Sequence, residues 1–208
     1  MYFCVIAVSL LWLCPSVSVL AQHHQAQFPW FVTAQVLAAR FHADLGYEAG
    51  GGVAVAVGRS LVGTRLAVVF GFSHARTTKS LVLIDGEHET GAAAYQVFVA
   101  TRAALQPTKV LPVEVFVDLQ TGWLHLRPRA FRFTAGALGE ITLQPPHENE
   151  FAPAWGAGLR WRLSSRFSAL AEVKQHFVRS AIAELERNST RPAWRPFYQW
   201  GAGFSAAF

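Results

Sequence analysis

The sequence predicts an all-β protein, an eight-stranded antiparallel up-and-down transmembrane β-barrel. Three observations lead to this expectation. The chain begins with a segment typical of exported proteins, the rest has no apolar run of about 18 residues, and many segments alternate apolar with small or polar residues. Without helices, backbone polar groups can be satisfied in lipid only when a sheet closes on itself. An exported, apolar chain with period-2 segments therefore indicates a barrel.

Composition supports a single folded domain. Of 208 residues, 52% are hydrophobic and only 15% are charged, and the mean hydropathy is +0.25. Disorder of the whole chain is thereby excluded. Both cysteines, Cys4 and Cys14, lie in the N-terminal segment, so a mature chain would have neither a disulfide scaffold nor a cysteine-based metal site.

Residues 1–21 are expected to be a signal peptide. An apolar stretch ends at Pro15, and Val19 and Ala21 occupy the −3 and −1 positions of a cleavage site. No Lys or Arg precedes the apolar stretch, and a retained membrane anchor is the alternative. The expected organisation is a signal peptide (1–21), a tail (22–30) that contains His23 and His24, and a barrel domain (31–208). Two adjacent histidines on a strand would point in opposite directions, so we expect no metal site there.

Eight segments are expected to be strands, because successive strand side chains point to opposite faces of a sheet. Segment 31–45 also tolerates a helical interpretation. The clearest hairpin joins the sixth and seventh segments through Ser164, Ser165 and Arg166. The expected strands are 31–45, 47–59, 63–74, 93–105, 111–123, 151–163, 167–178 and 197–208.

The connections alternate in length. Outer-membrane barrels have short periplasmic turns and longer external loops. Connections 60–62, 106–110 and 164–166 are short, whereas 75–92, 124–150 and 179–196 are long. Only the first external connection, near 44–47, breaks the pattern. A soluble lipocalin-like carrier is the alternative barrel, and it would turn its apolar face inward.

Two segments carry a family resemblance, "WGAGLRWRLSSRFSALAEVKQHF" and the terminal "YQWGAGFSAAF". They resemble the OmpA-like and opacity-protein-like outer-membrane β-barrels. The resemblance implies location in the bacterial outer membrane and a structural or surface-interaction role without enzymatic activity. It also implies that the barrel-assembly machinery recognises an assembly signal formed by Tyr198, Trp200, Phe204 and Phe208.

The inward face is expected to carry a lumenal charge network. An eight-stranded barrel is only wide enough for side chains to fill it, and charges removed from water need partners. We therefore expect these groups to plug the lumen, with a small gated pore as the alternative. Small residues at 50, 52, 54, 56 and 58 would leave room for opposing arginines. The network comprises Arg65, Arg102, Glu114, Asp118, Arg160, Arg162, Glu172 and Lys174.

No catalytic, cofactor-binding or metal-binding residues are expected. Ser168, Glu172 and His176 share one face, but residues four apart along a strand lie about 13 Å from each other, too far for a hydrogen-bonded triad. An outer-membrane lipid-modifying enzyme is the alternative function. Interfacial aromatic girdles are expected from Tyr95, Trp123, Trp161, Tyr198 and Trp200.

Arginine dominates the net charge of +5. We expect these arginines, in the loops, to contact lipopolysaccharide phosphates or acidic surfaces, or simply to be solvated. Outer-membrane lipids are expected partners, nucleic acid is not, and the chain is expected to be a monomer. The loop arginines are Arg127, Arg129, Arg132, Arg187, Arg191 and Arg195.

Overall fold

The structure is a computed structural model that describes residues 29–42, 45–62, 65–83, 86–105, 113–134, 136, 139–179 and 194–208. The expected signal peptide and most of the tail lie outside these residues, as do Arg187 and Arg191. No helix among the described residues is long and apolar enough to cross a membrane.

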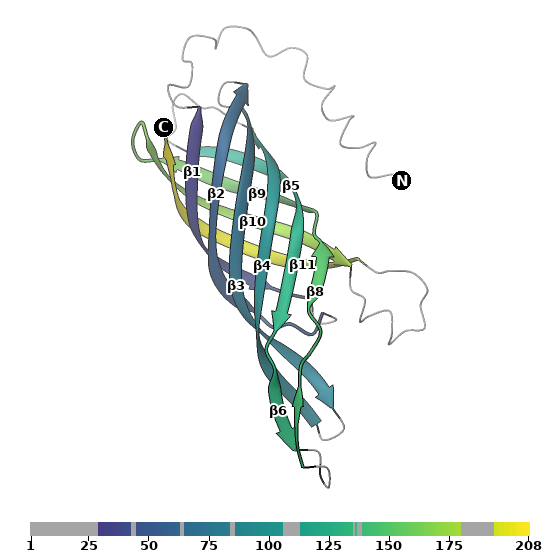
Figure 1. The fold of residues 1–208 in the computed structure, drawn as a ribbon. Coiled ribbons are helices and arrows are strands. Elements are labelled where there is room, and N and C mark those ends of the chain that lie inside the picture. The colour runs from purple at the N-terminus through teal and green to yellow at the C-terminus, as the bar shows by residue number, and fades with distance from the viewer. Residues whose placement is uncertain are drawn as a thin grey trace.

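Eight strands form a closed ring in which each strand pairs antiparallel with the next (Figure 1). The ring closes because the last strand pairs with the first, from Phe31 opposite Ala207 to Arg40 opposite Tyr198. Beyond that ladder, the Phe208 amide donates to the Trp30 carbonyl at 2.9 Å. The strands of the ring are β1 (Trp30–Arg40), β2 (Gly50–Val62), β3 (Leu66–Leu83), β4 (Gly86–Ala104), β5 (Val113–Pro128), β9 (Ala154–Arg162), β10 (Phe167–Arg179) and β11 (Trp194–Ala207).

The strand alternation puts the apolar side chains on the outside. Phe70, Val97 and Phe204 are each about 60% exposed, whereas alternate positions such as Gln96 and Ser205 are buried. This is the arrangement that lipid requires and the opposite of a lipocalin-like barrel. The transmembrane β-barrel expected from the sequence is confirmed, and residues 30–40 form a strand rather than a helix.

Two of the expected external loops contain long strands instead. β3 and β4 continue through most of 75–92 and leave only residues 84–85 between them. Segment 124–150 holds the end of β5, the hairpin of β6 (Phe131–Thr134) with β7 (Glu140–Leu143), and the start of β8 (Glu148–Phe151), which pairs with β5. Both faces of these extensions carry polar residues, so no apolar alternation marks them in the sequence.

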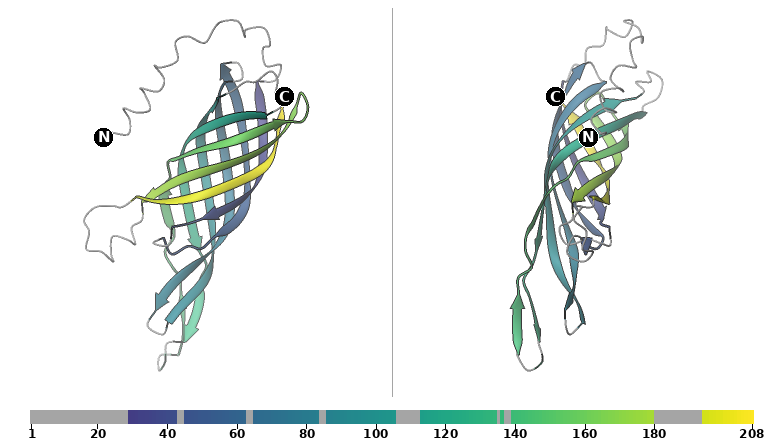
Figure 2. Two further views of the ribbon diagram at one scale, coloured as in Figure 1. Left: turned by 180° about the vertical axis from the view of Figure 1, so that it is seen from behind. Right: turned by 90° about the vertical axis from the view of Figure 1, so that its right-hand side faces the viewer.

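The extended strands form a projection on one end of the barrel. Figures 1 and 2 show the β3–β4 and β6–β7 hairpins reaching beyond the ring, while the C-terminal end of β11 lies at the opposite end. With short turns at the C-terminal end, the projection corresponds to the external side. We call the outward-reaching parts of β3, β4, β6 and β7 the external projection.

The first external connection turns into the barrel. Gly46 has a positive φ of 65°, a conformation that favours glycine. The Ser80 amide donates to the Gly46 carbonyl at 2.9 Å, and Tyr47 forms an isolated bridge with Lys79. The connection spans 41–49 rather than the expected 44–47, and its side chains Phe41, Leu45 and Tyr47 are buried.

We predict that Phe208→Asp lowers the yield of folded barrel several-fold, because it places a charge on the lipid-facing seam where β11 meets β1. The measurement is the fraction of protein with heat-modifiable gel mobility after expression. Val82→Asp is the matched control, since Val82 is 85% exposed in the external projection. Equal yields of the two variants would contradict the role of the terminal residue.

Candidate functional site: the barrel interior and its external rim

The interior is organised in layers that can be followed along β10. Its inward side chains are Val178, His176, Lys174, Glu172 and Leu170, from the external to the periplasmic end. Inward residues recur every second position along a strand. Apolar, polar-neutral and charged layers therefore follow one another down the barrel.

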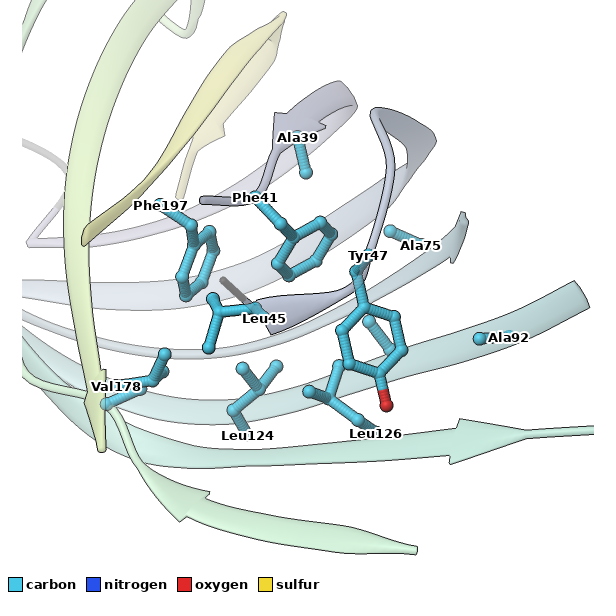
Figure 3. Packing of buried hydrophobic residues seen from close by; sticks show 12 residues of the cluster. Ala39, Phe41, Leu45, Tyr47, Ala75, Ala92, Leu124, Leu126, Val178 and Phe197 are labelled. Carbon is cyan, nitrogen blue, oxygen red and sulfur yellow. The ribbon is translucent and has the colours of Figure 1, made fainter. Parts of the chain in front are cut away.

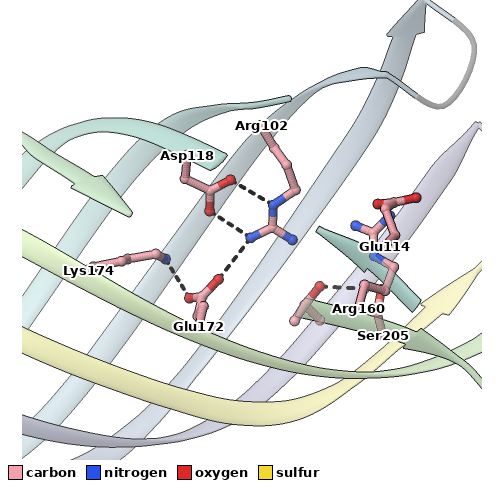
Figure 4. Close-up of polar contacts among 8 residues, drawn as sticks. Arg102, Glu114, Asp118, Arg160, Glu172, Lys174 and Ser205 are labelled. Carbon is pink, nitrogen blue, oxygen red and sulfur yellow. Dashed lines mark hydrogen bonds and ion pairs between the residues drawn. The ribbon is translucent and has the colours of Figure 1, made fainter. Parts of the chain in front are cut away.

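The charged layer is centred on Arg102 (Figure 4). Arg102 Nε and Nη2 each donate to a carboxylate oxygen of Asp118 at 2.8 Å, and Nη2 also donates to Glu172 at 2.9 Å. Lys174 Nζ lies 2.6 Å from the other oxygen of Glu172. All four residues are at most 7% exposed. Two cations and two anions thus neutralise one another in the lumen, and we call these four residues the charge network.

A second ion pair lies closer to the periplasmic end. Arg160 Nη1 donates to Glu114 Oε1 at 3.1 Å, and the two residues are direct partners in the β5–β9 ladder. The side chains are 22% and 14% exposed. This pair is therefore wetter than the charge network.

Arg65 and Arg162 do not join these contacts, and the expectation for them was wrong. Arg65 precedes β3, Arg162 ends β9, and both are exposed. The alternation that places Arg162 on the inward face is correct, but the sheet stops there. At this end of the barrel an inward-facing side chain reaches water.

The small residues on the inward face accommodate phenylalanine rings rather than arginines. At three places a phenylalanine lies directly opposite a glycine on the neighbouring strand. A Cβ at each glycine would fall 2.2–2.4 Å from the ring. A glycine is therefore needed under each ring, and the expected role of positions such as 58 is corrected. The pairs are Phe31 over Gly58, Phe98 over Gly71, and Phe116 over Gly158.

Each of these rings has a cation on it. The Arg102 guanidinium carbon lies 4.0 Å from the centroid of Phe116, and Lys174 Nζ lies 5.1 Å from that of Phe98. Arg160 lies 5.4 Å from the centroid of Phe31. Cations within about 6 Å of a ring centroid are attracted by its negative face. The rings thus hold the lumenal cations from the side away from their carboxylates.

His176 forms a neutral polar layer above the charge network. It is fully buried, its ring nitrogens lie 3.3 Å from Gln96 and 2.9 Å from Gln199, and its ring stacks on Phe197 at 4.4 Å. Ser168 and Glu172 are not among these partners. The three residue types of a hydrolase triad are therefore present on β10 without the contacts that a triad needs.

The external end of the interior is filled by an apolar cluster (Figure 3). Phe41 stacks on Phe197 with ring centroids 5.0 Å apart, and Tyr47 lies 5.6 Å from Phe41. Two of these three residues come from the inward-turned first connection. The cluster comprises Ala39, Phe41, Leu45, Tyr47, Ala75, Ala92, Ala94, Leu124, Leu126, Ala152, Val178 and Phe197.

Tyr47 fastens this cluster to the barrel through two buried charges. Its hydroxyl donates to Glu148 Oε1 and accepts from Lys79 Nζ, each at 3.2 Å, and Lys79 also pairs with Glu148. Burial and the negative charge of Glu148 raise the pKa of the Tyr47 phenol, so the hydroxyl stays protonated and available to donate. Sequence alternation could not reveal this contact, because it joins the first connection, β3 and β8.

The outer surface carries the expected aromatic residues. Trp123, Tyr198 and Trp200 are 41–63% exposed near the external end, and Trp161 is 57% exposed near the periplasmic end. Tyr95 is half-buried between His74, with ring centroids 4.8 Å apart, and His125 at 6.3 Å. The expected assembly-signal residues Tyr198, Trp200, Phe204 and Phe208 all lie on this outer face, and their role in assembly stays a prediction.

The expected basic loops are also mostly structured. Arg127 belongs to β5 and Arg129 follows it, both with exposed side chains, whereas Arg132 lies on β6, 3.7 Å from Glu140. Arg195 lies on β11.

Two solved structures are similar to this chain along most of its length. Neisserial surface protein A matches with a TM-score of 0.59 and 10% sequence identity, covering 86% of this chain and 97% of that one. The outer membrane protein OprG from Pseudomonas aeruginosa matches with a TM-score of 0.53 and 4% identity, covering 86% and 95%. The fold is that of the small outer-membrane β-barrels. No family model matches the sequence, and no curated protein sequence is significantly similar to it.

We predict that Arg102→Met destabilises the barrel by about 3–5 kcal/mol, because it leaves buried carboxylates without their cation. The measurement is the unfolding free energy in urea, followed by tryptophan fluorescence in lipid vesicles. Arg162→Met removes the same charge from an exposed position and is the control, with an expected change within about 0.5 kcal/mol. A similar small loss for both variants would show that Asp118 and Glu172 do not depend on Arg102.

Proposed function

We propose that this chain is a non-enzymatic outer-membrane protein whose barrel is closed to solutes. Its barrel would serve to anchor the external projection, which contacts the cell surroundings. The observation that carries the proposal is the continuous filling of the interior. Apolar cluster, His176 layer, charge network and the Arg160–Glu114 pair follow one another from one end to the other.

The character of each layer supports closure. Eight strands leave room for side chains only. Opening a water path through the charge network would require separating the Arg102–Asp118 and Lys174–Glu172 contacts. Opening the external end would require withdrawing Tyr47 from Lys79 and Glu148. A gated pore, the alternative, needs a bistable element that makes these changes together.

The polar groups of the interior also support a non-enzymatic role. A covalent or acid–base enzyme needs a nucleophile within reach of a base. Within the described part of the chain, His176 bonds to Gln96 and Gln199, and Glu172 is engaged by Arg102 and Lys174. These groups are committed to one another rather than aimed at a substrate position.

The external projection is held together well enough to act as one surface. The ring of His88 on β4 lies 5.8 Å from Phe131 and 5.7 Å from Phe133 on β6. The Arg129 amide donates to the Gly91 carbonyl at 2.8 Å. These contacts join the two hairpins, and the proposal assigns surface contacts to them. Barrel-assembly machinery and outer-membrane lipids are the proposed partners of the barrel itself.

We predict that the purified protein gives no stepwise conductance in planar lipid bilayers, because no continuous water path remains when both layers are in place. A general diffusion porin serves as the positive control. The matched variant combines Tyr47→Ala with Arg102→Ala, truncating one residue in each layer, and is expected to leak small ions. Discrete conductance steps from the unmodified protein would contradict closure.

The enzymatic alternative has its own test. Mass spectra of lipid A and phospholipids from cells with and without the protein are expected to be the same. A product present only in cells that contain the protein would contradict a non-enzymatic role.

A further inference from the structure

Three arginines gather on the outer face where the apolar band ends. Arg76 on β3, Arg127 on β5 and Arg129 after it all have exposed side chains. We infer that they form a binding site for the phosphate groups of a phosphorylated glycolipid, the lipid A class, in the external leaflet. This inference deepens the proposed function and rests on its placement of the barrel in the outer membrane.

The sheet register aligns two of the arginines in one row. Arg76 lies opposite Ala93 on β4, and Ala93 lies opposite Arg127 on β5. Neighbouring strands are about 4.8 Å apart, so the two arginine backbones lie on the order of 10 Å from each other. The residue between them is an alanine, which leaves the space above it open to both guanidinium groups.

Arg129 approaches the same place from the next row. Its backbone is fixed to β4, because its amide donates to the Gly91 carbonyl at 2.8 Å and its carbonyl accepts from the Thr90 hydroxyl at 2.9 Å. A Cβ at Gly91 would lie 3.7 Å from Arg129 Cδ. The Arg129 side chain therefore passes over Gly91, and small residues form the floor beneath all three arginines.

Two shallow cavities flank this row. One, of about 360 Å³, is lined by Tyr95, Arg127, Arg129 and Gln144 together with Ala93, Pro128 and Ala130. The other, of about 410 Å³, is lined by Arg76, Thr78, Gly50 and Gly51 together with Ala49 and Thr77. Each cavity has arginine on it and small residues beside it. A headgroup with phosphates on both sides of a sugar would match this division.

The arginines lie at the height of lipid headgroups. The outward residues of β3 are apolar up to Phe72, then His74 follows, then Arg76. From Leu66 to Arg76 a tilted strand rises roughly 25 Å, the height of the apolar band of outer-membrane barrels. His74 and Tyr95 are the interfacial aromatic residues just below. A phosphate at the level of Arg76 would therefore belong to a lipid whose chains lie along β3 and β4.

The charges of this site are uncompensated by the protein. Among the described residues no ion pair engages Arg76, Arg127 or Arg129, whereas Arg102, Arg132 and Arg160 each pair with a carboxylate. Guanidinium groups bind phosphate through two parallel hydrogen bonds. The contrast indicates that the anion for the three outer arginines comes from outside the chain.

The test uses the full chain folded in detergent micelles, titrated with diphosphoryl lipid A and with lipid A stripped of phosphate. Each single Arg→Gln change is expected to weaken binding of the phosphorylated lipid about tenfold, and Arg76→Gln with Arg127→Gln and Arg129→Gln by at least about 100-fold. Control variants are Arg132→Gln in the external projection and Arg162→Gln at the opposite end, each expected to change binding less than about twofold.

Unchanged binding by the folded triple variant would overturn the site, as would equal binding of the dephosphorylated lipid. Competition by inorganic phosphate at the concentration of the lipid would overturn the lipid as the source of the phosphate. Gel mobility and bilayer conductance of the same samples separate this test from the proposed function. Conductance by the unmodified protein would overturn closure of the barrel without affecting the arginine site.

Discussion

Closure of the sheet between β1 and β11 is the constraint on which the rest of the structure depends. It leaves no unpaired strand edge in lipid, and it confines all inward side chains to a space that eight strands make narrow. Every charge placed there must find a partner within that space. The bidentate contact between Arg102 and Asp118, shared with Glu172, is therefore a consequence of barrel size.

A repeated three-part arrangement satisfies this constraint. Glycine leaves space on one strand, phenylalanine from the next strand fills it, and a cation covers the ring, as with Gly158, Phe116 and Arg102. The same side chain thus packs, is attracted to a ring and pairs with carboxylates. On the outer face the logic is reversed, since Arg76, Arg127 and Arg129 have small neighbours and no carboxylate. One residue type serves closure inside and lipid contact outside.

The sequence predicted the barrel and most of its inward charges because period-2 alternation is enforced wherever one face meets lipid. Alternation disappears where both faces meet water, and the extensions of β3, β4 and β5 were expected to be loops for that reason. Tyr47, Lys79 and Glu148 come from three elements without a shared pattern, so their contact is visible only in three dimensions. The same holds for Phe31 above Gly58, because cross-strand register cannot be derived from alternation alone.

The central claim is a closed barrel embedded in the outer membrane, and fractionation of cells that express the full chain tests it most directly. The account predicts recovery in the outer-membrane fraction, with faster gel mobility before heating than after heating in detergent. Recovery as a soluble periplasmic protein whose mobility does not change with heating would contradict it.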